Sequence, residues 1–107
     1  MAAVLGGCGD GSGSTAPTAD RYDVFTIGDG FVPAFLEIAA GDTVRWTFAG
    51  GSDGLGHDVV FDATRAGRPA NIPVTKSGSV ARVFDARGTF PYDCFVHPGM
   101  RGEVTVR

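Results

Sequence analysis

The sequence is poor in the residues that bind metals or form disulfides. Its 107 residues include only 2 His, 2 Cys and 2 Met. Met1 is the initiator position and Cys8 lies in a Gly/Ser-rich leader. A four-cysteine zinc site, an iron–sulfur cluster and a scaffold with several disulfides are therefore excluded. The only soft or imidazole groups that the folded part offers to a metal or a catalytic site are His57, Cys94, His97 and Met100.

The sequence also lacks a basic stripe and a long apolar run. Twelve Asp and Glu stand against nine Lys and Arg, which gives a net charge of −3, and because the two signs are interspersed we expect no nucleic-acid partner. No apolar run approaches the ~20 residues of a membrane-spanning helix. A chain of ~100 residues predicts one domain with a single core, too small for a multi-site enzyme.

Residues 1–19 are predicted to be a leader and a flexible linker outside the folded domain. The segment Leu5-Gly6-Gly7-Cys8 resembles a lipobox, in which small residues precede a cysteine that is lipidated and becomes the mature N-terminus. Residues 9–19 are rich in Gly, Ser, Thr and Ala, as flexible linkers are. We expect a domain over residues 20–107 that associates with a membrane through a lipid on Cys8. The alternative is an incidental cysteine in a flexible N-terminus that lacks the basic region of an ordinary signal peptide.

The folded part is predicted to be all-β. From Arg21 onward, short β-prone runs alternate with Gly, Asp and Pro, and no amphipathic helical segment of useful length occurs. The period of two is clear where Val44, Trp46 and Phe48 are expected to face inward. Pro33 predicts an edge or a bulge, and seven or so strands imply a two-sheet sandwich. The expected strands are 22–27, 31–38, 43–48, 57–61, 79–84, 89–94 and 102–106, with an irregular stretch from 62 to about 77.

Three of the four scarce residues lie on one predicted loop between two strands. Cys94, His97 and Met100 are spaced at i, i+3 and i+6, and the Pro-Gly pair between them supplies a bend. His57 begins a predicted strand after a Gly-rich loop, and strand ends that are distant in sequence meet at one pole of a sandwich. Two His, a Cys thiolate and a weak axial Met form the ligand set of a mononuclear blue-copper electron-transfer site.

Five segments between Tyr22 and Val106 carry a family resemblance over nearly the whole domain. The sequence resembles cupredoxins of the plastocyanin type, most like their halocyanin and amicyanin branches. The resemblance implies a Greek-key β-sandwich of about seven to eight strands and one copper ion per chain. The segments are Phe31–Ile38, Gly41–Trp46, Gly56–Phe61, Gly88–Cys94 and Met100–Val106.

The same resemblance implies residue roles and a function. His57, Cys94 and His97 would be the equatorial copper ligands, and Met100 the axial ligand. The protein would then be a one-electron carrier, not an enzyme, which cycles between Cu(II) and Cu(I). The lipobox-like start followed by a linker also resembles halocyanins.

The sequence departs from the family pattern in three places. Asp58 stands where the family usually has Asn; a carboxylate there accepts backbone hydrogen bonds but cannot donate them, and it would lower the reduction potential. Val96 stands where plastocyanin-like members often have Pro, and its N–H could donate to the Cys94 sulfur and raise the potential. The short spacing from His97 to Met100 matches amicyanin-like loops.

Other readings of these residues remain open. The same ligands would serve a copper-storage or copper-delivery protein, and a non-metal adhesion module is a third possibility. A Cys8–Cys94 disulfide would join the leader to a strand end. A Cys94–His97 hydrolase dyad is disfavoured, because nothing in the sequence orients the base.

We expect a monomer on the extracytoplasmic side of the membrane, cell-surface or periplasmic. Redox protein partners would dock transiently on the exposed surface around His97, where an imidazole edge gives the shortest path to copper. Arg101 and Asp93, near this surface, would steer a partner weakly.

Overall fold

The computed structural model describes residues 19–49 and 53–107. The predicted lipidation site Cys8 and nearly all of the predicted leader and linker lie outside these residues. The described residues contain no helix long and apolar enough to cross a membrane. They form nine strands: β1 (Arg21–Ile27), β2 (Gly30–Val32), β3 (Phe35–Ile38), β4 (Asp42–Phe48), β5 (His57–Phe61), β6 (Ile72–Thr75), β7 (Gly78–Phe84), β8 (Gly88–Asp93) and β9 (Arg101–Val106).

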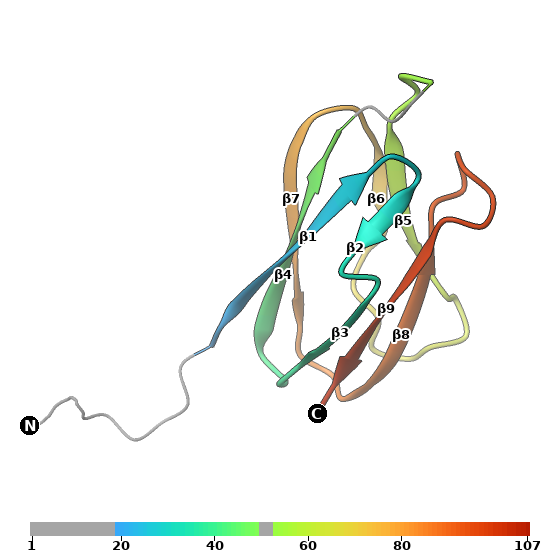
Figure 1. Cartoon of the computed structure of the whole chain (residues 1–107). Coiled ribbons are helices and arrows are strands. Elements are labelled where there is room, and N and C mark those ends of the chain that lie inside the picture. The colour runs from blue at the N-terminus through green and yellow to red at the C-terminus, as the bar shows by residue number, and fades with distance from the viewer. Residues whose placement is uncertain (1–18, 50–52) are drawn as a thin grey trace, which may run out of the picture.

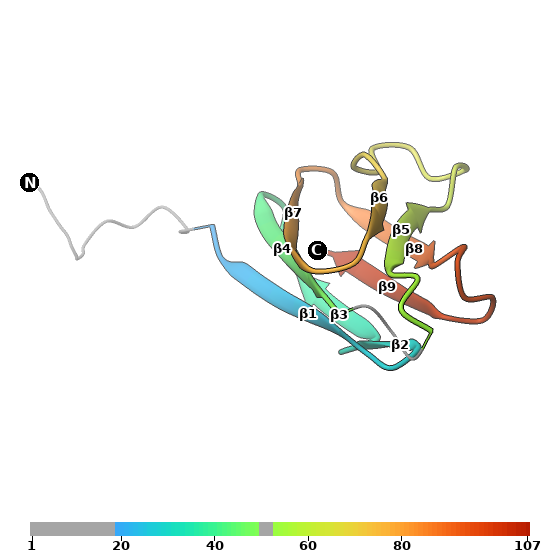
Figure 2. The ribbon, with the colours of Figure 1, turned by 90° about the horizontal axis from the view of Figure 1, so that it is seen from above.

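The strands form two sheets that pack face to face, which confirms the predicted all-β sandwich (Figures 1 and 2). The four-stranded sheet has the order β2-β1-β4-β7, and the five-stranded sheet has the order β3-β9-β8-β5-β6. The chain passes between the sheets after β2, β3, β4, β6 and β7. Such crossings place strands that follow one another in sequence on opposite sides of one core.

The structure contains more strands than the sequence predicts, for two reasons. The run 31–38 divides at Pro33, because the chain leaves the four-stranded sheet after β2 and joins the five-stranded sheet as β3. Both strands are sheet edges, as the proline predicts. The stretch 62–77, predicted to be irregular, contains the short edge strand β6.

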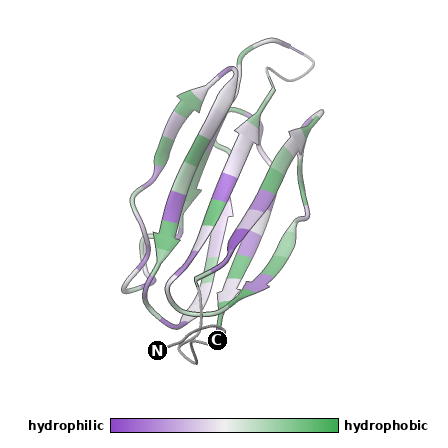
Figure 3. Cartoon of the chain, turned by 90° about the vertical axis from the view of Figure 1, so that its left-hand side faces the viewer, coloured by the Kyte–Doolittle hydropathy of each residue, from purple (hydrophilic) through white to green (hydrophobic). Residues whose placement is uncertain are grey.

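The core lies between the sheets, and β4 shows how the sequence builds it. Val44, Trp46 and Phe48 are buried and alternate with partly exposed residues, as predicted; Figure 3 shows hydrophobic and hydrophilic residues alternating along the strands. The Trp46 ring is fully buried, and its centroid lies 6.0 Å from that of Phe61 and 5.5 Å from that of Tyr92. Apolar burial of this kind is the main stabilising term of a small sandwich.

Arg82 interrupts the inward-facing alternation of β7. Its guanidinium donates hydrogen bonds to the carbonyl oxygens of Ala70 at 2.8 Å and Asn71 at 2.9 Å. These carbonyls come just before β6, so the arginine links an edge of one sheet to the segment that enters an edge of the other. A charged side chain is tolerated there because carbonyl oxygens satisfy its donors.

The two ends of the sandwich differ. The β1–β2 turn, the segment that enters β5 and the β8–β9 loop lie at one end, whereas the start of β1 and the C-terminus lie at the other (Figure 1). At the latter end the Asp42 carboxylate accepts hydrogen bonds from the backbone N–H groups of Asp20 and Ala39, both at 2.9 Å. We call the end that holds the β1–β2 turn and the β8–β9 loop the loop end of the domain.

Candidate metal centre

His57 reaches the loop end as the first residue of β5. Gly56 precedes it with φ +87°, a conformation that side chains rarely adopt, and a Cβ there would lie 2.8 Å from the Thr75 carbonyl oxygen of β6. Glycine is required at this position because it permits both the turn and the close approach of the two strands. His57 therefore enters the site with its backbone fixed by β6.

The loop between β8 and β9 is closed by its own hydrogen bonds. The Cys94 N–H donates to the Met100 carbonyl oxygen at 2.8 Å, and the Met100 N–H donates to the His97 carbonyl oxygen at 3.0 Å. Gly99, with φ +90°, provides the turn that the Pro-Gly pair predicts. The loop thus presents residues 94, 97 and 100 from a defined backbone.

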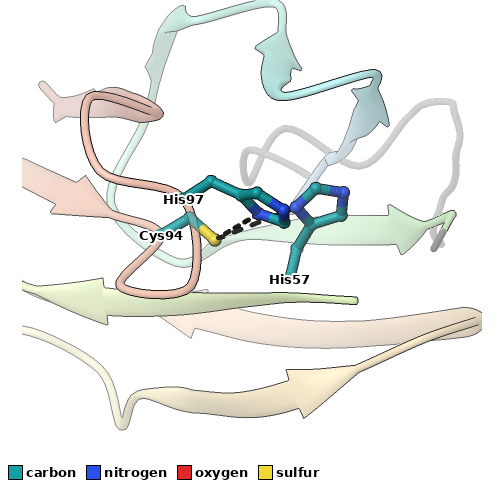
Figure 4. Close-up of side chains that lie close together, drawn as sticks. All are labelled: His57, Cys94 and His97. Atoms are coloured by element: carbon teal, nitrogen blue, oxygen red, sulfur yellow. Dashed lines mark hydrogen bonds between the residues drawn. The ribbon is translucent and has the colours of Figure 1, made fainter. Parts of the chain in front are cut away.

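The structure brings His57, Cys94 and His97 together (Figure 4). The Cys94 Sγ lies 3.8 Å from the His57 Nδ1 and 3.6 Å from the His97 Nδ1, and the three potential ligand atoms are within 4.8 Å of one another. All three side chains are buried, with exposed fractions of 0%, 1% and 8% for His57, Cys94 and His97. Met100 is also buried, at 3% exposed, at the end of the same loop.

Burial controls the protonation of these groups. It lowers the pKa of His57, and the nearby His97 lowers it further. Burial also raises the pKa of the Cys94 thiol, against the opposing effect of the backbone N–H groups of Asp58, His97 and Val96. A neutral imidazole is ready to bind a metal, whereas the thiol must release its proton on binding.

The donor set fits a soft transition metal. Two imidazoles, a thiolate and a nearby thioether match blue copper, since thiolate and thioether suit Cu(I) and imidazole suits both oxidation states. The His57 Nε2 is buried without a hydrogen-bond partner among the described residues. Its Nδ1, by contrast, faces Cys94. Cys94 is a free thiol among the described residues; Cys8 lies outside them, so the Cys8–Cys94 pairing is not tested.

Two carboxylates at the outer edge of His97 were not predicted from the sequence. The His97 Nε2 lies 2.8 Å from the Asp53 Oδ2 and 3.7 Å from the Asp29 Oδ1. Asp53 comes from the segment before β5 and Asp29 from the β1–β2 turn. Both residues lie beside glycines, which indicates from the sequence only that they are in loops. No spacing rule connects either residue to His97.

Three further residues near the site, Arg101, Asp93 and Tyr92, contact other residues of the domain. Arg101 and Asp93, predicted to steer a partner, pair with each other at 3.2 Å across β8 and β9. Their charges therefore largely offset one another. Tyr92 is buried, and its ring centroid lies 4.8 Å from that of Phe31, so it packs in the core beside the site.

A β-sandwich that gathers two imidazoles and a thiolate at its loop end is a mononuclear metal-binding domain of the soft-ligand class. The family described as copper binding proteins, plastocyanin/azurin family, matches residues 27–107. The chain belongs to this plastocyanin/azurin family of copper-binding proteins. Copper is therefore its metal, and His57, Cys94, His97 and Met100 are positioned to form a copper site.

Curated relatives agree with the family assignment. The chain is 32% identical to plastocyanin from Scenedesmus fuscus over 87 residues, which cover 72% of this chain and 86% of that protein. It is 34% identical to amicyanin from Paracoccus denitrificans over 73 residues, which cover 66% of this chain and 53% of that protein. The match thus spans about half the length of the amicyanin.

Solved structures confirm the cupredoxin fold. An oxidised amicyanin variant superposes with a TM-score of 0.68 and 28% identity, covering 80% of this chain and 81% of that chain. A copper-containing nitrite reductase from Thermus scotoductus superposes with a TM-score of 0.70 and 26% identity, covering 89% of this chain but 24% of that one. The fold therefore occurs both in small copper proteins and as part of a larger enzyme.

Proposed function

We propose that the protein is a one-electron carrier with a blue-copper centre. In this proposal His57, Cys94 and His97 are the equatorial ligands and Met100 is the axial ligand. The observation that carries it is the buried cluster in which one sulfur lies within 3.8 Å of two imidazole nitrogens. Membership of the copper-binding plastocyanin/azurin family supports it independently.

The chemistry follows from the donor set and its enclosure. Copper bound here would supply one-electron exchange between Cu(II) and Cu(I). The protein keeps His57 and Cys94 away from water by burying them, and it holds Cys94 and Met100 in one hydrogen-bonded loop. Ligands held in place in this way rearrange little when the charge of the site changes.

The number of histidines in the sequence supports an electron carrier in preference to an enzyme. The sequence contains two histidines, and both belong to this cluster. No imidazole of this chain is left for a second copper centre at which a substrate would react. The nitrite reductase matches this chain over 24% of its own length, so the shared fold does not extend its activity to this chain.

The surface around His97 is the proposed docking site for redox partners. His97 retains a small exposed fraction, and Pro98 and Gly99 beside it are exposed. Phe95 and Leu55 near the site are 67% and 54% exposed. Exposed apolar side chains near a metal ligand suit a brief encounter with a partner of modest contact area.

The remaining features of the proposal rest on the sequence. Residues 1–19 would form the leader and linker, and residues 20–107 the copper domain. A lipid on Cys8 would tether the domain to the extracytoplasmic side of the membrane, as a monomer of the halocyanin-like branch. Mass spectrometry of the membrane fraction, compared with a Cys8→Ser variant, tests this attachment.

Addition of Cu(II) to the purified protein tests the function. The expected result is an intense blue absorption with a reversible reduction potential. Cys94→Ser should abolish the colour because it removes the thiolate, whereas the matched Cys8→Ser variant should keep it. Colourless Cu(I) binding would favour the storage or delivery protein, and absence of copper binding would favour a non-metal module; either result would contradict the proposal.

A further inference from the structure

The outer edge of the His97 ring is held by a carboxylate. The His97 Nε2 lies 2.8 Å from the Asp53 Oδ2, within hydrogen-bond distance. The other oxygen of the same carboxylate, Oδ1, accepts the Leu55 backbone N–H at 3.0 Å. Asp53 is therefore oriented by its own turn, with one oxygen bonded to the turn and the other directed at His97.

This contact determines which nitrogen of His97 carries the proton. An ionised carboxylate accepts hydrogen bonds and donates none, so the short contact requires a proton on Nε2. The neutral ring then has its lone pair on Nδ1, the nitrogen that lies 3.6 Å from the Cys94 Sγ. Asp53 thus prepares the metal-facing nitrogen of His97 from the opposite side of the ring.

The two histidines of the site differ in this respect. The His57 Nε2 is buried and has no hydrogen-bond partner among the described residues. His97 has Asp53 at 2.8 Å and a second carboxylate, Asp29, at 3.7 Å, beyond hydrogen-bond distance. The histidine that contacts a carboxylate is therefore His97, which is the less buried of the two and lies at the proposed docking surface.

We propose that Asp53 is a positioning residue for the copper site. Its carboxylate holds His97 in the tautomer with a free Nδ1 and, together with Asp29, places negative charge that favours the oxidised over the reduced metal. This inference rests on the proposed function, in which His97 is a copper ligand. It adds that two carboxylates outside the ligand set, Asp53 in the turn before β5 and Asp29 in the β1–β2 turn, contribute to the reduction potential.

Three variants separate the hydrogen bond from the charge. Asp53→Ala removes both the acceptor and its charge. Asp53→Asn keeps an oxygen that can accept from Nε2–H but removes the charge. Asp29→Asn removes a charge at 3.7 Å without a hydrogen bond to lose, and serves as the matched control.

The first measurement uses the metal-free protein. The ¹⁵N chemical shifts of the His97 ring, recorded at about pH 8 where an ordinary histidine is neutral, report which nitrogen is protonated. We expect protonated Nε2 in the wild type, in Asp53→Asn and in Asp29→Asn, and a mixture of tautomers in Asp53→Ala. A wild-type tautomer in Asp53→Ala would overturn the positioning role, whether or not the protein binds copper.

The second measurement uses the copper-loaded protein. Loss of an outer hydrogen-bond partner lowers metal affinity by about 10–100-fold. If Asp53→Ala weakens Cu(II) about tenfold more than Cu(I), the potential rises by about 59 mV for one electron. Asp53→Asn and Asp29→Asn should also raise it, by less than Asp53→Ala. Unchanged potentials in all three variants, with the blue colour retained, would refute the charge effect while leaving the proposed function intact.

Discussion

The Asp58 carboxylate accepts the backbone N–H of Phe95 at 2.7 Å. This hydrogen bond joins the strand that begins at His57 to the loop that begins at Cys94, over a separation of 37 residues. The asparagine that the family usually has at position 58 would offer an amide oxygen for the same contact. The acceptor part of the link between the ligand segments is therefore present in this chain.

Replacement of Asp58 separates the link from its charge. Asp58→Asn keeps the acceptor oxygen, so we expect near wild-type stability and a higher reduction potential, because a negative charge near the metal is lost. Asp58→Ala removes the link as well and should lower the free energy of unfolding of the metal-free protein by about 1 kcal/mol. Urea denaturation and redox titration measure the two effects. A potential that stays at the wild-type value in Asp58→Asn would contradict the charge argument.

Val96→Pro tests the backbone N–H groups around the thiolate. Val96 lies two residues after Cys94, and its N–H is one of those that oppose the burial-driven rise in the pKa of the Cys94 thiol. Proline has no N–H, so the thiolate should donate more strongly to the metal and the reduction potential should fall. Val96→Ala, which keeps the N–H, is the control and should retain the wild-type potential. Equal potentials in the two variants would exclude this contribution.

Gly102→Ala should destabilise the core. Gly102 lies directly opposite Tyr92 in the β8–β9 pair, and a Cβ at this position would overlap the buried Tyr92 ring. We expect a loss of about 1–3 kcal/mol in the free energy of unfolding, the usual cost of overpacking. Gly30→Ala is the control, since its Cβ would meet the Ile27 carbonyl oxygen at an ordinary 3.6 Å. Equal losses of unfolding free energy in the two variants, measured by urea denaturation, would show that the Tyr92 ring moves aside at little cost and would contradict the prediction.

Asp42 predicts a specific acid sensitivity. Hydrogen bonds from the N–H groups of Asp20 and Ala39 hold the pKa of its carboxyl below the ordinary value of 3.8. Since the folded state favours the ionised form, this stabilisation is present above about pH 4 and is lost as the pH falls through the lowered pKa. The difference in unfolding free energy between wild type and Asp42→Asn should therefore be constant near neutral pH and shrink below about pH 4. A difference that grows on acidification would contradict the lowered pKa of Asp42.

The regular part of the fold could be predicted from local pattern. The alternation in 43–48 predicts which residues of β4 are buried, because one face of the strand meets the core. β6 gives no comparable signal, since Ile72 is its single buried residue and Pro73 follows it. The division at Pro33 could be located but not interpreted, because a change of sheet depends on partners elsewhere in the chain.

The candidate site shows the same division between local and distant information. Cys94, His97 and Met100 lie on one loop, so their spacing alone predicts that they meet. Asp53 lies 44 residues from His97 in the sequence, in a loop with no periodicity that would indicate the direction of its side chain. Its contact with His97 depends on the packing of two loops at one end of the sandwich.

The separation of the two ends of the domain has a consequence for electron delivery. The chain enters β1 at the end opposite to the β8–β9 loop (Figure 1), and the seven residues of β4 extend about 23 Å along the sandwich. A lipid on Cys8 would attach the domain through that far end, so the loop end would be the part of the domain farthest from the point of attachment. Soluble partners would then reach the loop end directly. A membrane-embedded partner would exchange electrons only when the linker lets the domain rotate its loop end toward the bilayer.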